Sequence, residues 1–210
     1  MTVILSIHYD SYTVKLYNMI KKIKDGRKLR SQNTSDHILS TIIRLAREGN
    51  QDINFDVIAK EAKLGTRTIF RHFEDKDALL EALNKKVRES IFNNFPKKSE
   101  NESLEKRMKS LISFLCDMYS KNKNLYYWTA INIVQSEQVY KNALAMYKLH
   151  RMNILKTLPE IESKDRREQE AIFQILSFAF WRDMRLFSKK KKKEIEEILI
   201  FNLKKHLSTK

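Results

Sequence analysis

Residues 54–73 read NFDVIAKEAKLGTRTIFRHF, and this stretch contains two short helical patterns joined by only about three residues, Lys63 to Gly65. Asn54 is a suitable cap for the first helix, and Gly65-Thr66 opens the second. So short a joint forces the two helices to cross steeply, which is the geometry of a helix-turn-helix. The apolar side chains expected to face inward are Ala59, Ala62, Leu64, Ile69, Phe70 and Phe73.

The second helix of such a pair protrudes, so its outward side chains can enter the major groove of DNA. These outward positions are Thr66, Arg67, Thr68 and Arg71. Helical periodicity alone leaves two interpretations open, a DNA-binding module and an ordinary helical hairpin.

The helices on either side of this motif complete an N-terminal domain, which we place at residues 35–96. Ser35 is a plausible N-cap for a helix that ends at Gly49-Asn50, and Asp75 opens a longer helix that ends before Pro96. The polar stretch from Lys97 to Ser103 predicts a domain boundary. The apolar faces of these helices comprise Ile38, Ile42, Leu45, Ala46, Leu79, Leu80, Leu83, Val87 and Ile91.

Residues 1–34 form a basic N-terminal extension. Apolar residues between positions 12 and 23 follow helical spacing, and we predict a separate helix there that ends near Asp25-Gly26. The polar stretch Arg30 to Thr34 then predicts a break in the chain. Two roles remain open for the extension: tracking along DNA phosphates or a minor groove, or packing on the N-terminal domain as an ordered helix.

The rest of the chain, residues 97–210, shows five further helical patterns and no sustained alternation, so the predicted fold class is all-α. Only 3 Gly and 2 Pro are present, too few for the many turns of a sandwich, a barrel or a doubly wound sheet. The five expected helices are Leu104 to about Lys121, Leu125 to Gln135, Ser136 to Leu158, Asp165 to Ser188, and Glu194 to Leu207.

An excess of 41 Lys and Arg over 26 Asp and Glu gives a net charge of +15, which favours nucleic acid or an anionic membrane as a partner. No apolar run approaches the roughly 20 residues needed to cross a bilayer, and the first residues lack the pattern of a signal peptide. We therefore expect a cytoplasmic protein with no membrane partner. The single cysteine, Cys116, is expected to be buried and inert, and the run Lys189 to Lys193 to be a solvated helix terminus.

The sequence contains no pattern typical of an enzyme or a metal site. Its five histidines are widely separated, and none has a Cys or Glu at metal-ligand spacing. There is no phosphate-binding Gly-rich loop, nucleophile elbow or paired-carboxylate signature of an active site. We therefore expect neither catalysis nor a metal or other cofactor.

Several residues of the N-terminal domain resemble, in identity and spacing, the signature of the TetR family of transcription regulators. The resemblance runs from Ser35 to about Leu83, roughly a quarter of the chain, and the five helices behind it are similar to the C-terminal half of that family in architecture only. The matching residues are Ile38-Leu39, Gly49, Ile58-Ala59, Ala62, Thr68-Ile69-Phe70-Arg71-His72-Phe73, Lys76 and Ala78-Leu79-Leu80.

This resemblance implies a homodimeric regulator, in most members a repressor, whose C-terminal domain binds a ligand that respaces the two DNA-binding domains. It also implies that Lys76 contacts a phosphate at the start of its helix. Asn54 is interpreted as a cap that also donates to a phosphate, and His72 has an alternative role as a structural hydrogen-bonding residue. The residues implied to contact DNA from the recognition helix are Thr66, Arg67, Thr68, Arg71 and His72.

Two positions in the motif depart from the family pattern. The family usually has Gly where this chain has Lys63, so either Lys63 is left-handed, at a cost of about 1 kcal/mol, or Gly65 takes the strain. The usual Tyr that reaches a phosphate is replaced by Phe70, which we expect to pack and not to contact DNA.

In this family an apolar ligand cavity lies among the C-terminal helices, and we predict Tyr119, Trp128, Met146 and Tyr147 as its lining. Plain core packing is their alternative role. A lining of aromatic and methionine side chains suits a planar or lipid-like small molecule. Asp117 and His150 lie nearby in the sequence, and we expect both to face solvent.

The predicted helix from Asp165 to Ser188 is apolar nearly all round, with Phe178 and Trp181 expected on opposite sides. One side would face its own domain and the other a partner subunit, together with the last helix. The leading hypothesis is therefore a homodimeric repressor that binds double-stranded DNA at a palindromic operator and is released by a small apolar or aromatic ligand. The alternative is an all-helical adaptor that binds a protein and has lost DNA binding.

Overall fold

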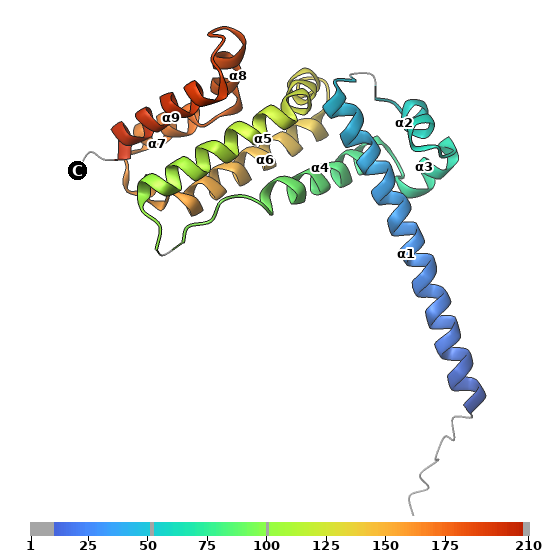
Figure 1. The fold of residues 1–210 in the computed structure, drawn as a ribbon. Helices are drawn as coiled ribbons and strands as arrows, with labels where there is room; N and C mark the ends of the chain where they lie inside the picture. The colour runs from blue at the N-terminus through green and yellow to red at the C-terminus, as the bar shows by residue number, and fades with distance from the viewer. Residues whose placement is uncertain (1–10, 51–52, 100, 208–210) are drawn as a thin grey trace, which may run out of the picture.

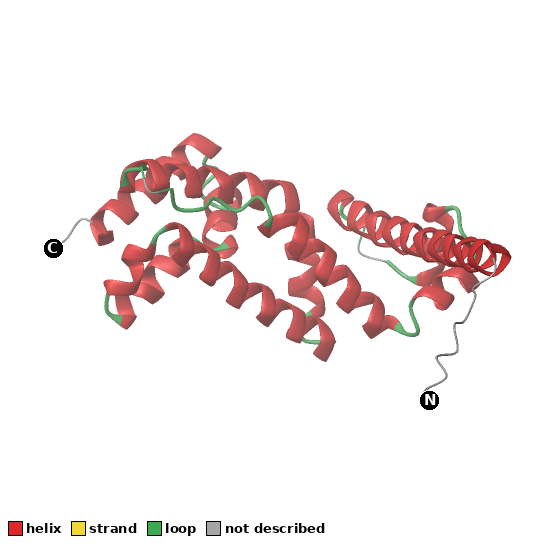
Figure 2. Ribbon diagram, turned by 90° about the horizontal axis from the view of Figure 1, so that it is seen from below, coloured by secondary structure: helices red, strands yellow, loops and turns green. Residues whose placement is uncertain are grey.

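The computed structural model describes residues 11–50, 53–99 and 101–207, and the side chains within these ranges from residue 26 onward. All regular structure in the described residues is helical, which confirms the predicted all-α fold (Figure 1, Figure 2). The elements are α1 (Ser11–Glu48), α2 (Phe55–Ala62), α3 (Thr66–His72), α4 (Lys76–Phe92), α5 (Leu104–Asn132), α6 (Glu137–Thr157), the 3-10 helix η1 (Pro159–Ser163), α7 (Arg166–Ile175), α8 (Phe178–Leu186) and α9 (Lys192–Leu207).

Helices α1 to α4 enclose the core of the N-terminal domain. The C-terminal half of α1 packs against α2, α3 and α4, because its apolar residues recur every three or four positions and face them. The predicted apolar faces are buried as expected: Ile38, Ile42, Leu45, Ala46, Ile58, Ala59, Ala62, Ile69, Phe73, Leu79, Leu80, Leu83, Val87 and Ile91.

The predicted break between Gly26 and Ser35 is wrong, because α1 runs through it from Ser11 to Glu48. An internal glycine such as Gly26 costs a helix only about 1 kcal/mol, which is too little to end it. Thr34 adds a hydrogen bond from its hydroxyl to the Arg30 carbonyl oxygen one turn earlier, at 2.9 Å. Ser35 is therefore no cap but an internal residue of α1. Residues 1–10 of the extension, and the side chains up to residue 25, lie outside the described part.

The predicted end of a helix at Lys121 to Asn124 is also wrong, because α5 continues to Asn132. Two asparagines in that polar stretch bind the C-terminal end of α1. The Asn122 side-chain oxygen accepts from Arg47 Nε at 3.0 Å, and Asn124 donates to the Arg47 carbonyl oxygen at 2.8 Å. These residues join the N-terminal domain to the C-terminal helices.

The single helix predicted from Asp165 to Ser188 is divided into α7 and α8 at Leu176-Ser177. Asp165 caps α7, and the Ser177 hydroxyl caps α8 by accepting from the Phe180 amide at 3.2 Å. Phe178 and Trp181 lie on the same side of α8, with stacked rings whose centroids are 5.6 Å apart. The predicted opposite placement fails because residues three apart lie on one helical face.

The C-terminal helices form a layered bundle beside the N-terminal domain. Helix α5 lies at its centre, packed against α6, α8 and α9, and α4 reaches from the N-terminal domain to lie along α6 (Figure 1). Cys116 is buried in this core, and burial raises the pKa of its thiol to about 12, as expected for an inert cysteine. In the part of the chain that the structure describes, no helix combines the length and the apolar character needed to span a membrane.

Candidate functional site

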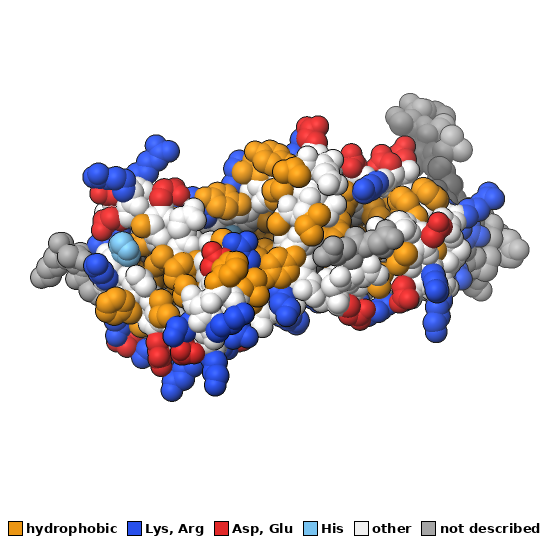
Figure 3. All heavy atoms as spheres, turned by 90° about the horizontal axis from the view of Figure 1, so that it is seen from above, with side chains coloured by type: hydrophobic (Ala, Val, Ile, Leu, Met, Phe, Trp, Pro, Cys, Tyr) orange, Lys and Arg blue, Asp and Glu red, His pale blue; other side chains and the backbone are white. Residues whose placement is uncertain are grey.

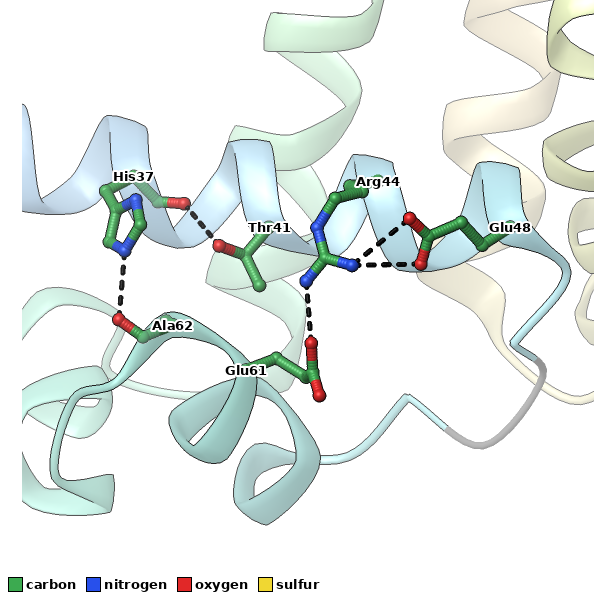
Figure 4. Close-up of polar contacts among 6 residues, drawn as sticks. All are labelled: His37, Thr41, Arg44, Glu48, Glu61 and Ala62. Carbon is green, nitrogen blue, oxygen red and sulfur yellow. Dashed lines mark hydrogen bonds and ion pairs between the residues drawn. The ribbon is translucent and has the colours of Figure 1, made fainter.

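Helix α1 holds α2, the first short helix of the motif, in place through polar contacts (Figure 4). His37 Nε2 lies 2.9 Å from the Ala62 carbonyl oxygen at the C-terminal end of α2. Arg44 bridges Glu48 on its own helix, at 2.9 Å, and Glu61 on α2, at 2.7 Å. These contacts fix the angle of α2 on α1, and so the position of α3 behind it.

The turn between α2 and α3 places its strain on Lys63, which has the left-handed angles φ 54° and ψ 42°. Gly65 is extended, with φ −74° and ψ 145°, so it takes no strain. The turn closes with a hydrogen bond from the Leu64 amide to the Ala59 carbonyl oxygen at 2.9 Å, the pattern in which a left-handed residue usually ends a helix. Of the two alternatives from the sequence, the left-handed Lys63 is therefore the one observed.

The outward face of α3 presents the predicted recognition residues. Arg67 and Arg71 are exposed on it, one turn apart. Thr66 and Thr68 are half-buried, and the Thr66 hydroxyl lies 3.4 Å from a carboxylate oxygen of Asp56 on α2. The two arginines are thus the long donors that α3 offers to a ligand outside the protein.

His72 makes a structural contact at the C-terminal end of α3. Its Nδ1 lies 2.9 Å from the hydroxyl oxygen of Ser35 on α1. The contact ties the recognition helix to α1 and matches the alternative role considered for this histidine.

Phe70 does not face inward as predicted, because half of its surface (50%) is exposed. Ile69 and Phe73 already occupy the inward face of this seven-residue helix. The Phe70 ring instead packs against Phe55 at the start of α2, with the centroids 4.6 Å apart. The Phe70 ring therefore packs α3 against the start of α2, and its exposed part lies on the outer side of α3, as Arg67 and Arg71 do.

Asn54 and Lys76 lie at the N-terminal ends of α2 and α4. The Asn54 side-chain oxygen caps α2 by accepting from the amides of Asp56 and Val57 at 3.1 and 3.0 Å. Lys76 is exposed at the first position of α4, where Asp75 already caps the Ala78 amide at 2.7 Å. Lys76 therefore places an exposed ammonium group at this helix terminus, next to Asp75 in the chain.

A cavity of about 360 Å³ lies among the C-terminal helices and is bounded on one side by α4. All four residues predicted for a ligand site, Tyr119, Trp128, Met146 and Tyr147, line it. Residues on α4 complete the wall: Leu80, Leu83, Asn84, Val87, Ile91 and Phe92. A second cavity of about 150 Å³ lies nearer to α1 and α2 and shares Leu80, Leu83, Leu125 and Trp128 with the first.

Several polar residues that the sequence analysis did not assign to the larger cavity also line it: Asn84, Thr129, Asn142, His150, Arg151, Gln174 and Ser177. Three of them, His150, Asn84 and Asn142, form contacts with side chains on other helices. His150 was expected to face solvent, but it lines the cavity, and desolvation lowers its pKa to about 4. Its Nε2 lies 3.1 Å from the Tyr119 hydroxyl, which itself donates to the Leu176 carbonyl oxygen at 2.6 Å. Asp117, by contrast, is exposed as expected and pairs with Lys192 at 2.6 Å.

The other two polar residues, Asn84 on α4 and Asn142 on α6, form an amide link across the cavity wall. Asn84 donates to the Asn142 side-chain oxygen at 3.0 Å, and Asn142 donates to the Leu80 carbonyl oxygen at 3.2 Å. The sequence alone does not distinguish Asn84 and Asn142 from solvated helix residues, because the group that each one binds lies about sixty positions away in the chain.

The geometry so far defines a helical protein with an exposed, arginine-bearing recognition helix, which is the class of DNA-binding transcriptional regulators. Residues 38–83 match the sequence profile of a family described as "Bacterial regulatory proteins, tetR family". The N-terminal domain is therefore a TetR-type helix-turn-helix domain, and the resemblance found in the sequence is confirmed.

A solved structure supports the fold over most of the chain. The "putative transcriptional regulator from Pseudomonas aeruginosa PAO1" superposes with a TM-score of 0.60 at 14% sequence identity, and the match covers 87% of this chain and 92% of that one. No curated protein sequence matches the chain significantly.

Proposed function

We propose that this regulator is a homodimeric repressor that binds a palindromic operator and is released when a small apolar or aromatic molecule enters the larger cavity. The observation that carries the proposal is the double role of α4, which lines the cavity along its length and presents Lys76 beside the recognition helix at its N-terminal end. A molecule that displaces α4 would therefore move the DNA-binding residues.

The proposal assigns different tasks to the DNA-binding residues. The exposed guanidinium groups of Arg67 and Arg71 read base edges in the major groove, where arginine pairs well with guanine. Lys76 binds a backbone phosphate, and Thr66, Thr68, His72 and Asn54 complete the contact surface around these residues. The lost Tyr hydroxyl at Phe70 removes one phosphate contact, so the arginines and Lys76 carry more of the affinity.

We expect Arg67→Ala to cost about 1 to 3 kcal/mol on the operator and to relax sequence preference, because a base contact is lost. Lys76→Ala should weaken all DNA sequences by a similar factor, because phosphates are common to them. The measurement is fluorescence anisotropy with a duplex selected by the wild-type protein and a random duplex of equal length. Equal losses of both variants on both duplexes would contradict these roles.

In one conformation the two DNA-binding domains of the dimer are spaced to fit the operator, and in the other they are not. For release, the ligand must bind the second conformation more tightly than the first, since equal affinity shifts no equilibrium. The lining is mostly apolar and aromatic, and its polar side chains include His150, the Asn84–Asn142 link and Arg151, whose charge is paired with Glu170. Such a site suits a planar apolar molecule with one or two hydrogen-bonding groups.

The cavity is tested with the neutral aromatic dye N-phenyl-1-naphthylamine and the variant Ala143→Phe, which places a ring where Ala143 lines the cavity. We expect the dye to bind the wild-type protein and to weaken its hold on the selected duplex, and the variant to lose both effects while it still binds DNA. Ala145→Phe, on the same helix but away from the lining, is the control. Dye binding that is unchanged in Ala143→Phe would refute the cavity as the ligand site.

The proposed dimer uses exposed apolar side chains on the last two helices. The sequence analysis placed the interface on the helix from Asp165 to Ser188 and on the last helix, but Leu176 and Leu199 in these segments are buried in their own subunit, so they cannot meet a partner. Leu186, Phe187 and Phe201 are exposed, the last two to 76% and 70%. Figure 3 shows hydrophobic side chains on one face of the molecule, interspersed with charged ones. A second copy that covers them would bring two recognition helices to one operator.

A further inference from the structure

Helix α1 extends far beyond the domain that it supports. Figure 1 shows its N-terminal half projecting past α2, α3 and α4 into open space. From Ser11 to Thr34 the helix has 24 residues, or roughly 36 Å at 1.5 Å per residue. That length is about one turn of a DNA duplex.

The described side chains of this projection do not pack on the protein. Arg27, Lys28 and Arg30 are exposed, and Leu29 is exposed between them. A Cβ atom added at Gly26 would meet no heavy atom within 4 Å. Of the two roles left open by the sequence, packing on the N-terminal domain is therefore excluded for residues 26–33.

The projection is strongly basic along its sequence. Residues 11–34 contain seven Lys or Arg and one Asp, a net charge of +6 in a chain whose total is +15. So high a density of positive charge favours an anionic partner.

The projection also starts beside the recognition helix. Ser35 contacts His72 at the C-terminal end of α3, at 2.9 Å, and the adjacent Asp36 pairs with Lys86 of α4 at 2.6 Å. These contacts fix the direction in which α1 leaves the domain. A duplex held by Arg67 and Arg71 would therefore lie within reach of the basic projection.

From this arrangement we propose that the N-terminal half of α1 is a second DNA-binding element, which binds backbone phosphates that flank the half-site contacted by α3. The inference rests on the proposed DNA-binding function and adds a sequence-independent contact to it. The ligand is the phosphate backbone of a duplex, because the exposed cations Arg27, Lys28 and Arg30 on a basic helix attract phosphates whatever the base sequence.

The test uses the full-length protein and the variant Arg27→Gln, Lys28→Gln, Arg30→Gln, which keeps helix-forming side chains and removes three charges. The matched control, Lys189→Gln, Lys191→Gln, Lys193→Gln, removes three exposed charges from the far end of the molecule. Binding is measured between 50 and 200 mM salt on mixed-sequence duplexes of 20 and 40 base pairs with the same centre, and circular dichroism checks that the helix content is kept.

The association constant K falls with salt, and we expect the α1 variant to make the plot of log K against log salt less steep by about 2 to 3 per chain. Each neutralised phosphate contributes about 0.9 to that steepness. It should lose at least tenfold in affinity for the 40-base-pair duplex at 0.1 M salt and much less for the shorter one. The control should match the wild-type protein on both.

A slope for the α1 variant equal to that of the control would overturn the inference and leave the proposed function standing. If the wild-type protein bound neither duplex, the proposed function would fail as well. Co-sedimentation with vesicles containing phosphatidylserine tests the other polyanion. A variant that lost vesicle binding but kept its DNA slope would show that the projection binds a membrane and would overturn the inference too.

Discussion

At the scale of single residues, Lys63 shows how a turn can keep its geometry with an unfavourable side chain. Its left-handed angles let the Leu64 amide close the turn onto Ala59, so the position of α3 depends on a conformation that a residue with a Cβ adopts at a cost. The exposed Lys63 side chain offers a cation next to the motif, which is of use to a protein that binds phosphates.

We expect Lys63→Gly to stabilise the protein by about 0.5 to 1 kcal/mol, because glycine adopts the left-handed region without strain and only part of this gain is offset by its larger freedom in the unfolded chain. Urea unfolding measures the change. The control, Lys60→Gly in the helical part of α2, should destabilise by a similar amount. If Lys63→Gly destabilised the protein as Lys60→Gly does, the turn would not be strained.

At the scale of elements, two polar links join the N-terminal domain to the C-terminal helices. Arg47 binds Asn122 and Asn124, which connects α1 to α5, and the Asn84–Asn142 pair connects α4 to α6. The second link borders the larger cavity, so a ligand there can compete for its amide groups. A displacement of α4 then costs these hydrogen bonds, which makes the link a point of coupling between the cavity and the DNA-binding domain.

Asn142→Ala should therefore lower the free energy of unfolding by about 1 to 2 kcal/mol, since it leaves the half-buried Asn84 amide without its partner. It should also reduce the concentration of N-phenyl-1-naphthylamine needed to release DNA, because less of the binding energy is spent on moving α4. Asn153→Ala is the control, because Asn153 donates only within its own helix, to the Leu149 carbonyl oxygen at 2.8 Å. Identical dose curves for the two variants would remove the Asn84–Asn142 link from the release mechanism.

At the scale of the whole molecule, the proposed dimer depends on apolar side chains that are exposed on the C-terminal helices. Large apolar side chains exposed together are uncommon on a monomer and are typical of interfaces. Leu186 and Phe187 are exposed at the end of α8, and Phe201 is exposed on α9. A dimer through these side chains would also give the two-fold symmetry that a palindromic operator requires.

Phe201→Glu is expected to convert the dimer to a monomer at micromolar concentration and to weaken operator binding at least tenfold, because one recognition helix is then left to bind alone. Light scattering coupled to gel filtration gives the mass. Val134→Glu, at a side chain that is 86% exposed just beyond α5, should leave the dimer intact. A wild-type protein that runs as a monomer would rule out the two-fold arrangement.

Local features of this protein were determined by the sequence itself. The caps at Asn54 and Asp75 were predicted correctly, and so were most of the buried positions of the motif, with the exception of Phe70. These features depend on residues that are close together in the chain. A cap bonds to an amide two or three residues away, and helical spacing shows which side chains share a face. The sequence therefore also contains what identifies the TetR-type domain.

The tertiary structure alone decided the features that depend on distant partners. The polar stretch around Asn122 was predicted to end a helix. Asn122 instead lies within α5, where its side chain accepts a hydrogen bond from Arg47, 75 positions away. His150 was predicted to face solvent, but it contacts Tyr119 and lines the cavity. Phe70 was predicted to face inward, but Ile69 and Phe73 occupy that side and Phe70 is half exposed. The free energy of such contacts arises only when segments far apart in the chain meet, so no local pattern records them.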